Sequence, residues 1–230
     1  SSGNVSIVAK NPSNVSSLPQ LLALTIDKTI ATPGLSLACD SGNSASDKVS
    51  SSASLTLSGV ETGAVVEYST NGSVWGTTFT ATEGVNTVSV RQTDAAGNVA
   101  TSSALNFTLD TTAPAPVVTV SPIAGDDAIG PVDAQATTTT IVGEVTNALA
   151  GDKVSVFVHG QTFTGTVDAS GHYSVEVTTA NLVADSDKSI SVVVDATDAA
   201  GNTKTGVADH SYSVDTGAPT VQSLSISKPA

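Results

Sequence analysis

Apolar and polar residues alternate in short runs along residues 110–215, with the period of two that is typical of β-strands. The runs predict seven strands, at residues 117–120, 138–145, 154–159, 162–167, 172–177, 189–196 and 203–214. Turn-forming sequences such as Asp168-Ala169-Ser170-Gly171 and Asp198-Ala199-Ala200-Gly201-Asn202 separate them. No run has a convincing helical period, so we expect this part of the chain to be all β.

Residues 27–109 follow a similar but less regular pattern. It predicts strands at residues 35–38, 54–57, 65–69, 77–80, 87–93 and 104–109. A chain that crosses a series of tandem domains needs an odd number of strands in each, so we infer a further short strand near Val74 and Trp75. Trp75 is the only Trp, and we interpret it as a core or core-edge residue in preference to a ligand-stacking residue.

Short strands separated by turns at this spacing are typical of an immunoglobulin-like β-sandwich. We therefore predict tandem seven-stranded sandwiches in a linear rod, with domains at residues 27–109 and 110–215. Residues 1–26 are interpreted as the C-terminal remnant of a preceding domain or an irregular lead-in, and residues 216–230 as the start of a following domain or a tail. Cys39 is the only cysteine, so no intramolecular disulfide stabilises these domains.

One pattern occurs three times along the chain. An apolar residue, a hydroxyl residue, an apolar residue and an Asp follow one another at Leu24-Thr25-Ile26-Asp27, at Phe107-Thr108-Leu109-Asp110 and at Tyr212-Ser213-Val214-Asp215. Such a repeat indicates a tandem array. Each of its Asp residues falls where one predicted domain ends and the next begins.

Charge excludes several partners. The formal net charge is −13, and the chain has only 8 Lys and Arg residues, so it lacks the basic surface that nucleic acids or anionic membranes require. No apolar run approaches the roughly 20 residues that cross a bilayer, and we expect no membrane insertion. We find no signal peptide, so the chain is either a fragment or exported by a route that does not use one.

Strand direction predicts which acidic residues lie together. In a seven-stranded sandwich with alternating strands, every second loop lies at the same end of the domain. We therefore expect Asp27, Glu61 and Asp94 to lie at the start of the first domain. We expect Asp40, Asp47 and Asp110 to lie at its end, where Asp198 and Asp195 of the second domain join them. At the end of the second domain we expect Asp126, Asp127 and Asp215.

Carboxylates gathered in this way repel one another unless a cation is present. Ca²⁺ is the cation we expect, because it accepts six to eight hard oxygen ligands in irregular geometry. Zn²⁺ requires Cys or His ligands, and the three His residues are far apart in the sequence. The alternative is that these Asp residues only form turns and caps. No catalytic motif is present, so we predict that the protein is not an enzyme.

Each predicted domain contains several short motifs in a fixed order. The motifs in the first domain are Gly59-Val60-Glu61-Thr62-Gly63, Tyr68-Ser69-Thr70-Asn71-Gly72 and Val90-Arg91-Gln92-Thr93-Asp94. Those in the second are Gly143-Glu144-Val145, Ala150-Gly151-Asp152-Lys153-Val154, Gly165-Thr166-Val167, Gly171-His172-Tyr173-Ser174-Val175 and Asp198-Ala199-Ala200-Gly201-Asn202. In this order they resemble the bacterial Ig-like repeats of giant adhesins that Gram-negative bacteria secrete through type I systems, as in RTX-type and non-fimbrial adhesins. The resemblance implies a cell-surface location, Ca²⁺ at domain junctions and a role in adhesion or in spanning distance.

The leading hypothesis is a calcium-rigidified spacer of a surface adhesin, extracellular and monomeric, that projects a distal binding domain toward a host cell or another surface. Its immediate partners are then the neighbouring Ig-like domains of the same chain. Two alternatives remain open. In the first, one domain binds a glycan or protein ligand, and the region of Trp75 and the irregular N-terminal segment are the features that suggest it. In the second, the domains are accessory parts of a secreted polysaccharide-degrading enzyme.

Overall fold

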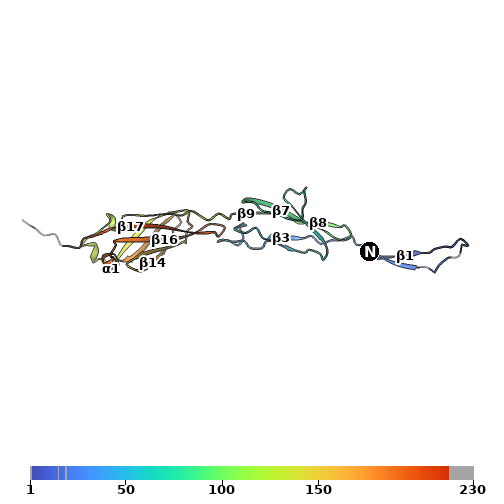
Figure 1. The fold of residues 1–230 in the computed structure, drawn as a ribbon, viewed down its shortest axis with the longest axis horizontal. Coiled ribbons are helices and arrows are strands. Elements are labelled where there is room, and N and C mark those ends of the chain that lie inside the picture. The colour runs from blue at the N-terminus through green and yellow to red at the C-terminus, as the bar shows by residue number, and fades with distance from the viewer. Residues whose placement is uncertain (1, 15, 19, 218–230) are drawn as a thin grey trace, which may run out of the picture. The chain divides into compact units, whose positions relative to one another are not determined.

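The computed structural model describes residues 2–14, 16–18 and 20–217. The chain divides into two compact units, unit 1 at Ser1–Asp110 and unit 2 at Thr111–Ala230. Unit 1 begins with a hairpin in which β1 (Ser2–Ile7) pairs antiparallel with β2 (Gln20–Thr25) (Figure 1). Residues 218–230 lie outside the described residues. The assignment of residues 1–26 and 216–230 to neighbouring domains therefore stays a prediction.

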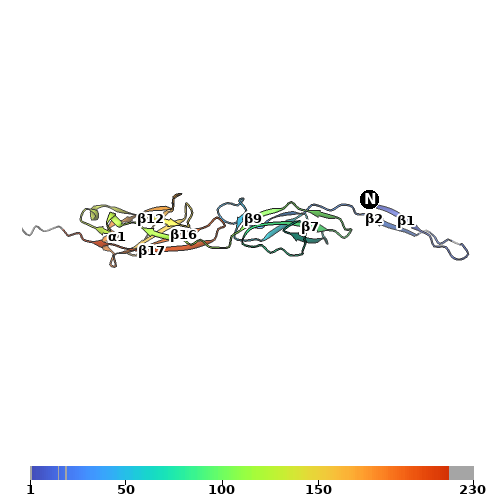
Figure 2. The ribbon, with the colours of Figure 1, turned by 90° about the horizontal axis from the view of Figure 1, so that it is seen from above.

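The sandwich of unit 1 follows this hairpin. Its strands are β3 (Gly34–Leu37), β4 (Val49–Ser50), β5 (Leu55–Ser58), β6 (Val65–Ser69), β7 (Gly84–Thr93), β8 (Val99–Thr101) and β9 (Leu105–Leu109). Strands β3 and β5 form one sheet. The other has the order β4-β9-β7-β6, with β8 also paired to β7. Figure 2 shows β7 and β9 running alongside each other in this sheet.

Small aliphatic residues and one aromatic pair fill the core of unit 1. Val88, Leu105 and Phe107 are buried, and the ring of Phe79 meets that of Phe107 edge to face with 6.4 Å between centroids. Residues of β3 and β5 such as Leu35 and Leu55 pack on this cluster from the opposite sheet. The alternation that predicted strands here is thus the alternation of core and surface positions.

Unit 2 is a larger sandwich of the same class. Its strands are β10 (Val117–Val120), β11 (Ala128–Ile129), β12 (Thr138–Thr146), β13 (Lys153–Val158), β14 (Gln161–Thr166), β15 (His172–Thr178), β16 (Ser189–Thr197), β17 (Thr203–Ser211) and β18 (Ser213–Val214). One sheet has the order β10-β12-β15 and the other β14-β13-β16-β17. Figures 1 and 2 show these strands running along the unit, with the short helix α1 (Thr179–Ala184) at one end.

Both sheets of unit 2 contribute alternate residues to one core. Val154, Val156 and Val158 point inward from β13, and Val192 and Val194 do so from the neighbouring β16. At one edge of the core, the hydroxyl of Tyr173 donates a hydrogen bond to the carbonyl oxygen of Thr119 at 2.7 Å, and burial raises the pKa of this Tyr to about 12. The all-β sandwich class predicted from the sequence is confirmed.

Some local predictions are wrong. Residues 77–80 form no strand, and near Val74 and Trp75 there is only a single bridge, between Gly76 and Tyr68. Phe79 does pack against the core. The apolar residue that suggested a strand at residues 77–80 is therefore partly buried, but the backbone around it does not pair with another strand. Helix α1 was missed because it has only six residues and buries just two, Thr179 and Leu182.

Gly143 offers a test of the packing in unit 2. A Cβ atom at this position of β12 would overlap the carbonyl oxygen of Thr119 and the ring of Tyr173. We expect Gly143→Ala to lower the free energy of unfolding by about 1–3 kcal/mol, as overpacking of a core does. Urea unfolding measures this, with Gly76→Ala as the control because a Cβ there meets no atom within 4 Å. Equal stabilities of the two variants would contradict the packing described.

Candidate functional site

Three of the predicted ligands of unit 1 form hydrogen bonds with the consecutive residues Lys48, Val49 and Ser50. The carboxylate of Asp40 accepts a hydrogen bond from the amide of Lys48 at 3.0 Å, and that of Asp47 accepts one from the amide of Val49 at 3.0 Å. The backbone amide of Asp110 donates to the carbonyl oxygen of Ser50 at 3.0 Å. Asp40, Asp47 and Asp110 therefore gather at the end of unit 1 where β9 ends, as strand direction predicted.

The last of these bonds continues a short parallel ladder. Strand β4 pairs with β9, with Val49 opposite Thr108 and Ser50 opposite Leu109. Hydroxyl groups hold the adjoining loop against this ladder: the buried Ser50 donates from Oγ to the carbonyl oxygen of Cys39 at 3.1 Å, and the hydroxyls of Ser41 and Ser50 lie 3.2 Å apart. The loop that carries Asp40 is thus fixed by backbone and hydroxyl contacts.

One carboxylate oxygen in this loop is buried without a partner. Oδ1 of Asp40 makes no hydrogen bond in the described part of the chain, although its other oxygen is bonded to Lys48. Leaving a buried acceptor unsatisfied is costly. A groove of about 290 Å³ adjoins it and is lined by Asp40, Lys48 and Leu105 among others. This oxygen is the clearest place in unit 1 for a bound cation.

Unit 2 repeats the same arrangement at the end of its last strands. Strand β11 pairs in parallel with β18, and the amide of Asp215 donates to the carbonyl oxygen of Ile129 at 3.1 Å, as Asp110 does to Ser50. Asp126 accepts from the amide of Ala128 at 3.1 Å, which matches Asp47 and Val49. Asp126, Asp127 and Asp215 therefore also lie together.

The residues that precede the short strands β4 and β11 have different side chains but the same backbone conformation. Lys48 and Asp127 both have a left-handed conformation, with φ of 61° and 60°. The carbonyl oxygen of each accepts a hydrogen bond at 2.8 Å from the last strands, from Thr108 and Ser213 respectively. The two units thus present a cationic side chain and an anionic one at equivalent positions.

Asp127 has a partner that the sequence did not reveal. Its Oδ1 lies 2.6 Å from Nε2 of His210 and accepts the amide of Ile123 at 2.8 Å. The bond to His210, followed by that to Ile123, holds the pKa of Asp127 below its usual value. His210 and Asp127 are 83 residues apart, so no local pattern could identify the pair.

At the opposite end of unit 1, Glu61 holds the incoming chain. Its Oε1 accepts the amide of Ala31 at 2.7 Å, four residues after Asp27. The fully buried side chain of Gln92 donates to the carbonyl oxygens of Ala31 and Gly59 and accepts the amide of Glu61. Gln92, which the sequence did not single out, therefore fixes Glu61 at the end of unit 1 to which Asp94 also belongs.

Asp94 is occupied within its own turn. Its Oδ1 accepts the amides of Ala96 and Asn98, and its Oδ2 accepts the side-chain amide of Asn98 at 2.7 Å. These bonds, led by that from the Asn98 side chain, lower the pKa of Asp94. The equivalent turn of unit 2 uses Asp198 and Asn202 in the same way. Both Asp residues thus form turns, the alternative that the sequence left open.

Two further candidates lie elsewhere in unit 2 and in the first linker. Asp195 is exposed on β16, two residues before the end of that strand, and accepts a hydrogen bond from the hydroxyl of Thr205 at 3.1 Å. Asp27 accepts from the amide of Thr29, two residues on, just as Asp215 accepts from the amide of Gly217. The linkers of Asp27 and Asp215 therefore share a local turn as well as a sequence pattern.

Comparison with known proteins identifies the chain. Residues 25–111 match the family model of the bacterial Ig-like domain. A bacterial immunoglobulin-like domain from the M. primoryensis ice-binding adhesin is 39% identical over 45% of this chain and 100% of that domain, with a TM-score of 0.42. The chain belongs to the bacterial Ig-like domain family.

Two longer solved structures match most of the chain. One, from work described as "Ca2+-stabilized adhesin helps an Antarctic bacterium reach out and bind ice", is 26% identical with a TM-score of 0.54, over 93% of this chain and 57% of that one. The other, from a study of host cell surface retention of a 1.5-MDa bacterial ice-binding adhesin, is 29% identical with a TM-score of 0.52, over 91% and 73%. No curated protein matches the chain.

The Ig-like units satisfy part of what calcium requires. No group of three or more His, Cys, Asp or Glu side chains in the described ranges is arranged to hold a metal ion by itself. Ca²⁺ also accepts backbone carbonyl oxygens, neutral side-chain oxygens and water. The loop of Asp40 supplies a buried carboxylate oxygen that has no hydrogen-bond partner among the described residues, and an oxygen of this kind could serve as one Ca²⁺ ligand.

Trp75 lies at the surface of the first Ig-like unit without being fully exposed. The guanidinium carbon of Arg91 lies 4.5 Å from the centre of its ring, and Nε of Arg91 is 2.8 Å from the carboxylate of Glu67. Trp75 therefore packs in a cation–π contact of about 0.5–2 kcal/mol. This structural contact agrees with its interpretation as a core-edge residue.

The pair of Asp127 and His210 predicts a pH-dependent contribution to stability. Because the pKa of Asp127 is lowered in the folded state, its ionised carboxylate stabilises unit 2 at pH values above 3.8, the ordinary pKa of Asp. This contribution is lost as the pH falls through the lowered pKa of the folded state. We expect Asp127→Ala to be less stable than the native chain at about pH 7, and the difference to shrink toward about pH 2. Urea unfolding at a series of pH values measures it. Asp209→Ala is the control, and a difference that does not shrink would contradict the assignment.

From the turn of Asp94 we predict that the shape of this side chain contributes more to the stability of unit 1 than its negative charge does. Asn at position 94 keeps the Oδ1 acceptor that receives the amides of Ala96 and Asn98, whereas Ala removes it. In the presence of a chelator, we expect Asp94→Asn to unfold close to the native midpoint and Asp94→Ala to unfold earlier. Thermal unfolding followed by circular dichroism compares them. Equal losses in the two variants would show that the negative charge, and not the turn, is what the position needs.

Proposed function

We propose that this chain is a spacer segment of a large bacterial cell-surface adhesin and that Ca²⁺ bound at the ends of its Ig-like units stiffens it. Family membership and the similarity to two solved structures from studies of bacterial ice-binding adhesins support the adhesin context. One of these relatives is described as Ca²⁺-stabilised. No helix in the described residues is long and apolar enough to cross a membrane.

The buried Oδ1 of Asp40 is the observation that carries the proposal. It belongs to the loop whose two Asp residues are tied to Lys48 and Val49, beside the backbone bond from Asp110 to Ser50. Without a cation, an oxygen of this kind lacks a partner, and nearby carboxylates repel one another. Bound Ca²⁺ would satisfy the oxygen and neutralise part of the charge.

The same chemistry extends the proposal to the other predicted ligands. Asp126, Asp127 and Asp215 would serve a second site at the end of unit 2, and Glu61 and Asp27 one at the start of unit 1. Asp195 and Asp198 of unit 2 stay predicted ligands, and Asp198 is in addition hydrogen-bonded within its own turn. The domains are then residues 27–109 and 110–215, and each linker Asp serves the boundary between neighbours.

This role is mechanical and not catalytic. Because Ca²⁺ binds the folded state and not the unfolded one, it stabilises each unit by mass action, and ligands from both sides of a boundary would limit bending of the linker. The segment would work outside the cell or at its surface, as a monomer, with neighbouring Ig-like domains of the same chain as partners. Adhesion itself would reside in a distal domain that contacts a host cell or another surface.

Thermal unfolding tests the proposal directly. Ca²⁺ at about one hundred times its Kd adds about 2.7 kcal/mol of stability, so we expect the melting temperature of the unit concerned to rise by roughly 10–20 °C over that in chelator. Asp40→Asn and Asp110→Asn should each reduce the rise, because they remove negative charge from the candidate site.

Glu176→Gln is the matched control, since Glu176 is an exposed carboxylate on β15, away from the candidate ligands. It should respond to Ca²⁺ as the native chain does. Mg²⁺ should raise the melting temperature less, because it prefers an octahedral site with several retained waters. Identical melting curves in Ca²⁺ and in chelator would overturn the proposal.

A further inference from the structure

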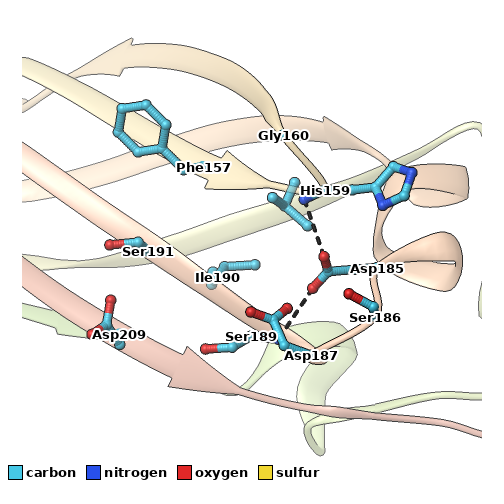
Figure 3. A pocket seen from close by; sticks show the side chains of 11 residues that line it. Phe157, His159, Gly160, Asp185, Ser186, Asp187, Ser189, Ile190, Ser191 and Asp209 are labelled. Carbon is cyan, nitrogen blue, oxygen red and sulfur yellow. Dashed lines mark hydrogen bonds between the residues drawn. The ribbon is translucent and has the colours of Figure 1, made fainter.

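Unit 2 carries an open groove of about 700 Å³ that no part of the spacer role uses. It lies on the outward face of the β14-β13-β16-β17 sheet and extends to the loop after α1. Figure 3 shows Phe157, Ser191 and Asp209 on neighbouring strands at one end, and Asp185, Ser186 and Asp187 at the other. The groove therefore joins a rigid sheet to the loop that follows the helix.

Strand register sets the spacing of the first group. Phe157 of β13 pairs with Ser191 of β16, which pairs with Asp209 of β17. Neighbouring strands are about 4.8 Å apart, so the row extends over about 10 Å from the aromatic ring to the carboxylate. That length suits a ligand of one or two six-membered rings.

Phe157 presents an apolar surface at the head of this row. It is 42% exposed, whereas Val156 and Val158 on either side of it in sequence are buried in the core. A single exposed apolar residue is common at a protein surface. Here, however, it lines a groove together with hydroxyl and carboxylate groups, the combination of apolar and orienting polar contacts found in small-molecule sites.

The polar groups beside Phe157 have unused hydrogen-bonding capacity. The hydroxyls of Ser186 and Ser191 and the carboxylate of Asp209 make no side-chain hydrogen bond to any other residue that the structure describes. Most Asp side chains discussed above are occupied within their own turns, so Asp209 is different. Three acceptors, two of them also donors, are thus available to a ligand.

Asp185 makes the floor of the groove rigid. This buried carboxylate accepts the amides of His159 and Ser189, both at 3.2 Å, and the hydroxyl of Tyr212 at 3.3 Å. Figure 3 shows the two amide bonds. Together the three bonds tie the loop after α1 to the turn after β13, to the start of β16 and to Tyr212, the residue that follows β17. Binding a ligand therefore requires little ordering of the protein, which favours affinity.

We propose that this groove binds a saccharide that is neutral or carries an amino group. The C–H face of a sugar ring packs on an aromatic ring such as that of Phe157, and its hydroxyls donate to Asp209 and exchange hydrogen bonds with Ser191. Among the described residues that line the groove there is no Lys or Arg, whereas Asp185, Asp187 and Asp209 all line it. Anionic sugars would be repelled, so the site selects by charge as well as by shape.

The inference goes beyond the spacer role and does not rest on it. It gives the alternative ligand-binding hypothesis a place in unit 2, away from Trp75. An organic ligand is the occupant we infer, because the groove combines an exposed aromatic ring with hydroxyl and carboxylate groups. Binding measurements in a constant Ca²⁺ concentration separate the two proposals, because a failure of sugar binding leaves the melting response unaffected.

Titration of the native chain with tri-N-acetylchitotriose, its deacetylated form and sialyllactose tests the inference. Calorimetry should show saturable binding of one or both of the first two and none of sialyllactose. Phe157→Ala and Asp209→Asn should each weaken binding about tenfold or more, because a hydrogen bond to a charged group is worth about 1.5–3 kcal/mol. Both residues are exposed, so the variants should fold normally.

Matched controls lie on the opposite sheet. Val142→Ala removes a 40% exposed apolar residue and Glu176→Gln an exposed carboxylate, and neither should change the affinity. The inference is overturned if no neutral or amino sugar binds, if sialyllactose binds best, or if only a lysine-rich peptide binds. Binding that is equally strong in Phe157→Ala and Asp209→Asn would also overturn it.

Discussion

The structure at the end of each Ig-like unit depends on a short parallel ladder of backbone hydrogen bonds. The ladder joins the last strand of the unit to a two-residue strand that follows the first loop of the unit. In unit 1 it pairs β4 with β9, and in unit 2 it pairs β11 with β18. Its final bond comes from the backbone amide of Asp110 or Asp215. Because these bonds use only main-chain atoms, the ladder tolerates Lys48 in one unit and Asp127 in the other. In both units the ladder nevertheless brings the first loop close to the linker Asp, which is Asp110 in unit 1 and Asp215 in unit 2.

Acidic residues serve two different purposes around this frame. Asp94 and Asp198 accept hydrogen bonds within their own turns and need no external partner to be satisfied. Asp40 is different, because one of its oxygens is buried without a hydrogen-bond partner among the described residues. The sequence contains many more Asp than Glu residues. This excess is explained partly by turn chemistry and partly, we propose, by calcium. The side chain of Asp209 lines a groove with Phe157 and makes no hydrogen bond in the part of the chain that the structure describes, so it belongs to neither group.

The sequence predicted the long strands well because each buries every second residue. Strands β7, β12 and β16 have nine or ten residues and a clear alternation. It could not predict β4 or β11, since two residues carry no period and their pairing is made by partners about 60 to 85 positions away. For the same reason it grouped Asp40, Asp47 and Asp110 correctly by strand direction but missed His210 beside Asp127 and Gln92 beside Glu61.

Diffraction from crystals of this chain grown with Ca²⁺ is the most direct test of calcium binding at the loop of Asp40. We expect anomalous difference density within about 2.3–2.6 Å of Oδ1 of Asp40, and we expect it to be lost when crystals are grown in chelator. Density for a water molecule alone at that oxygen in both crystals, with no cation bound at the end of unit 1, would contradict it.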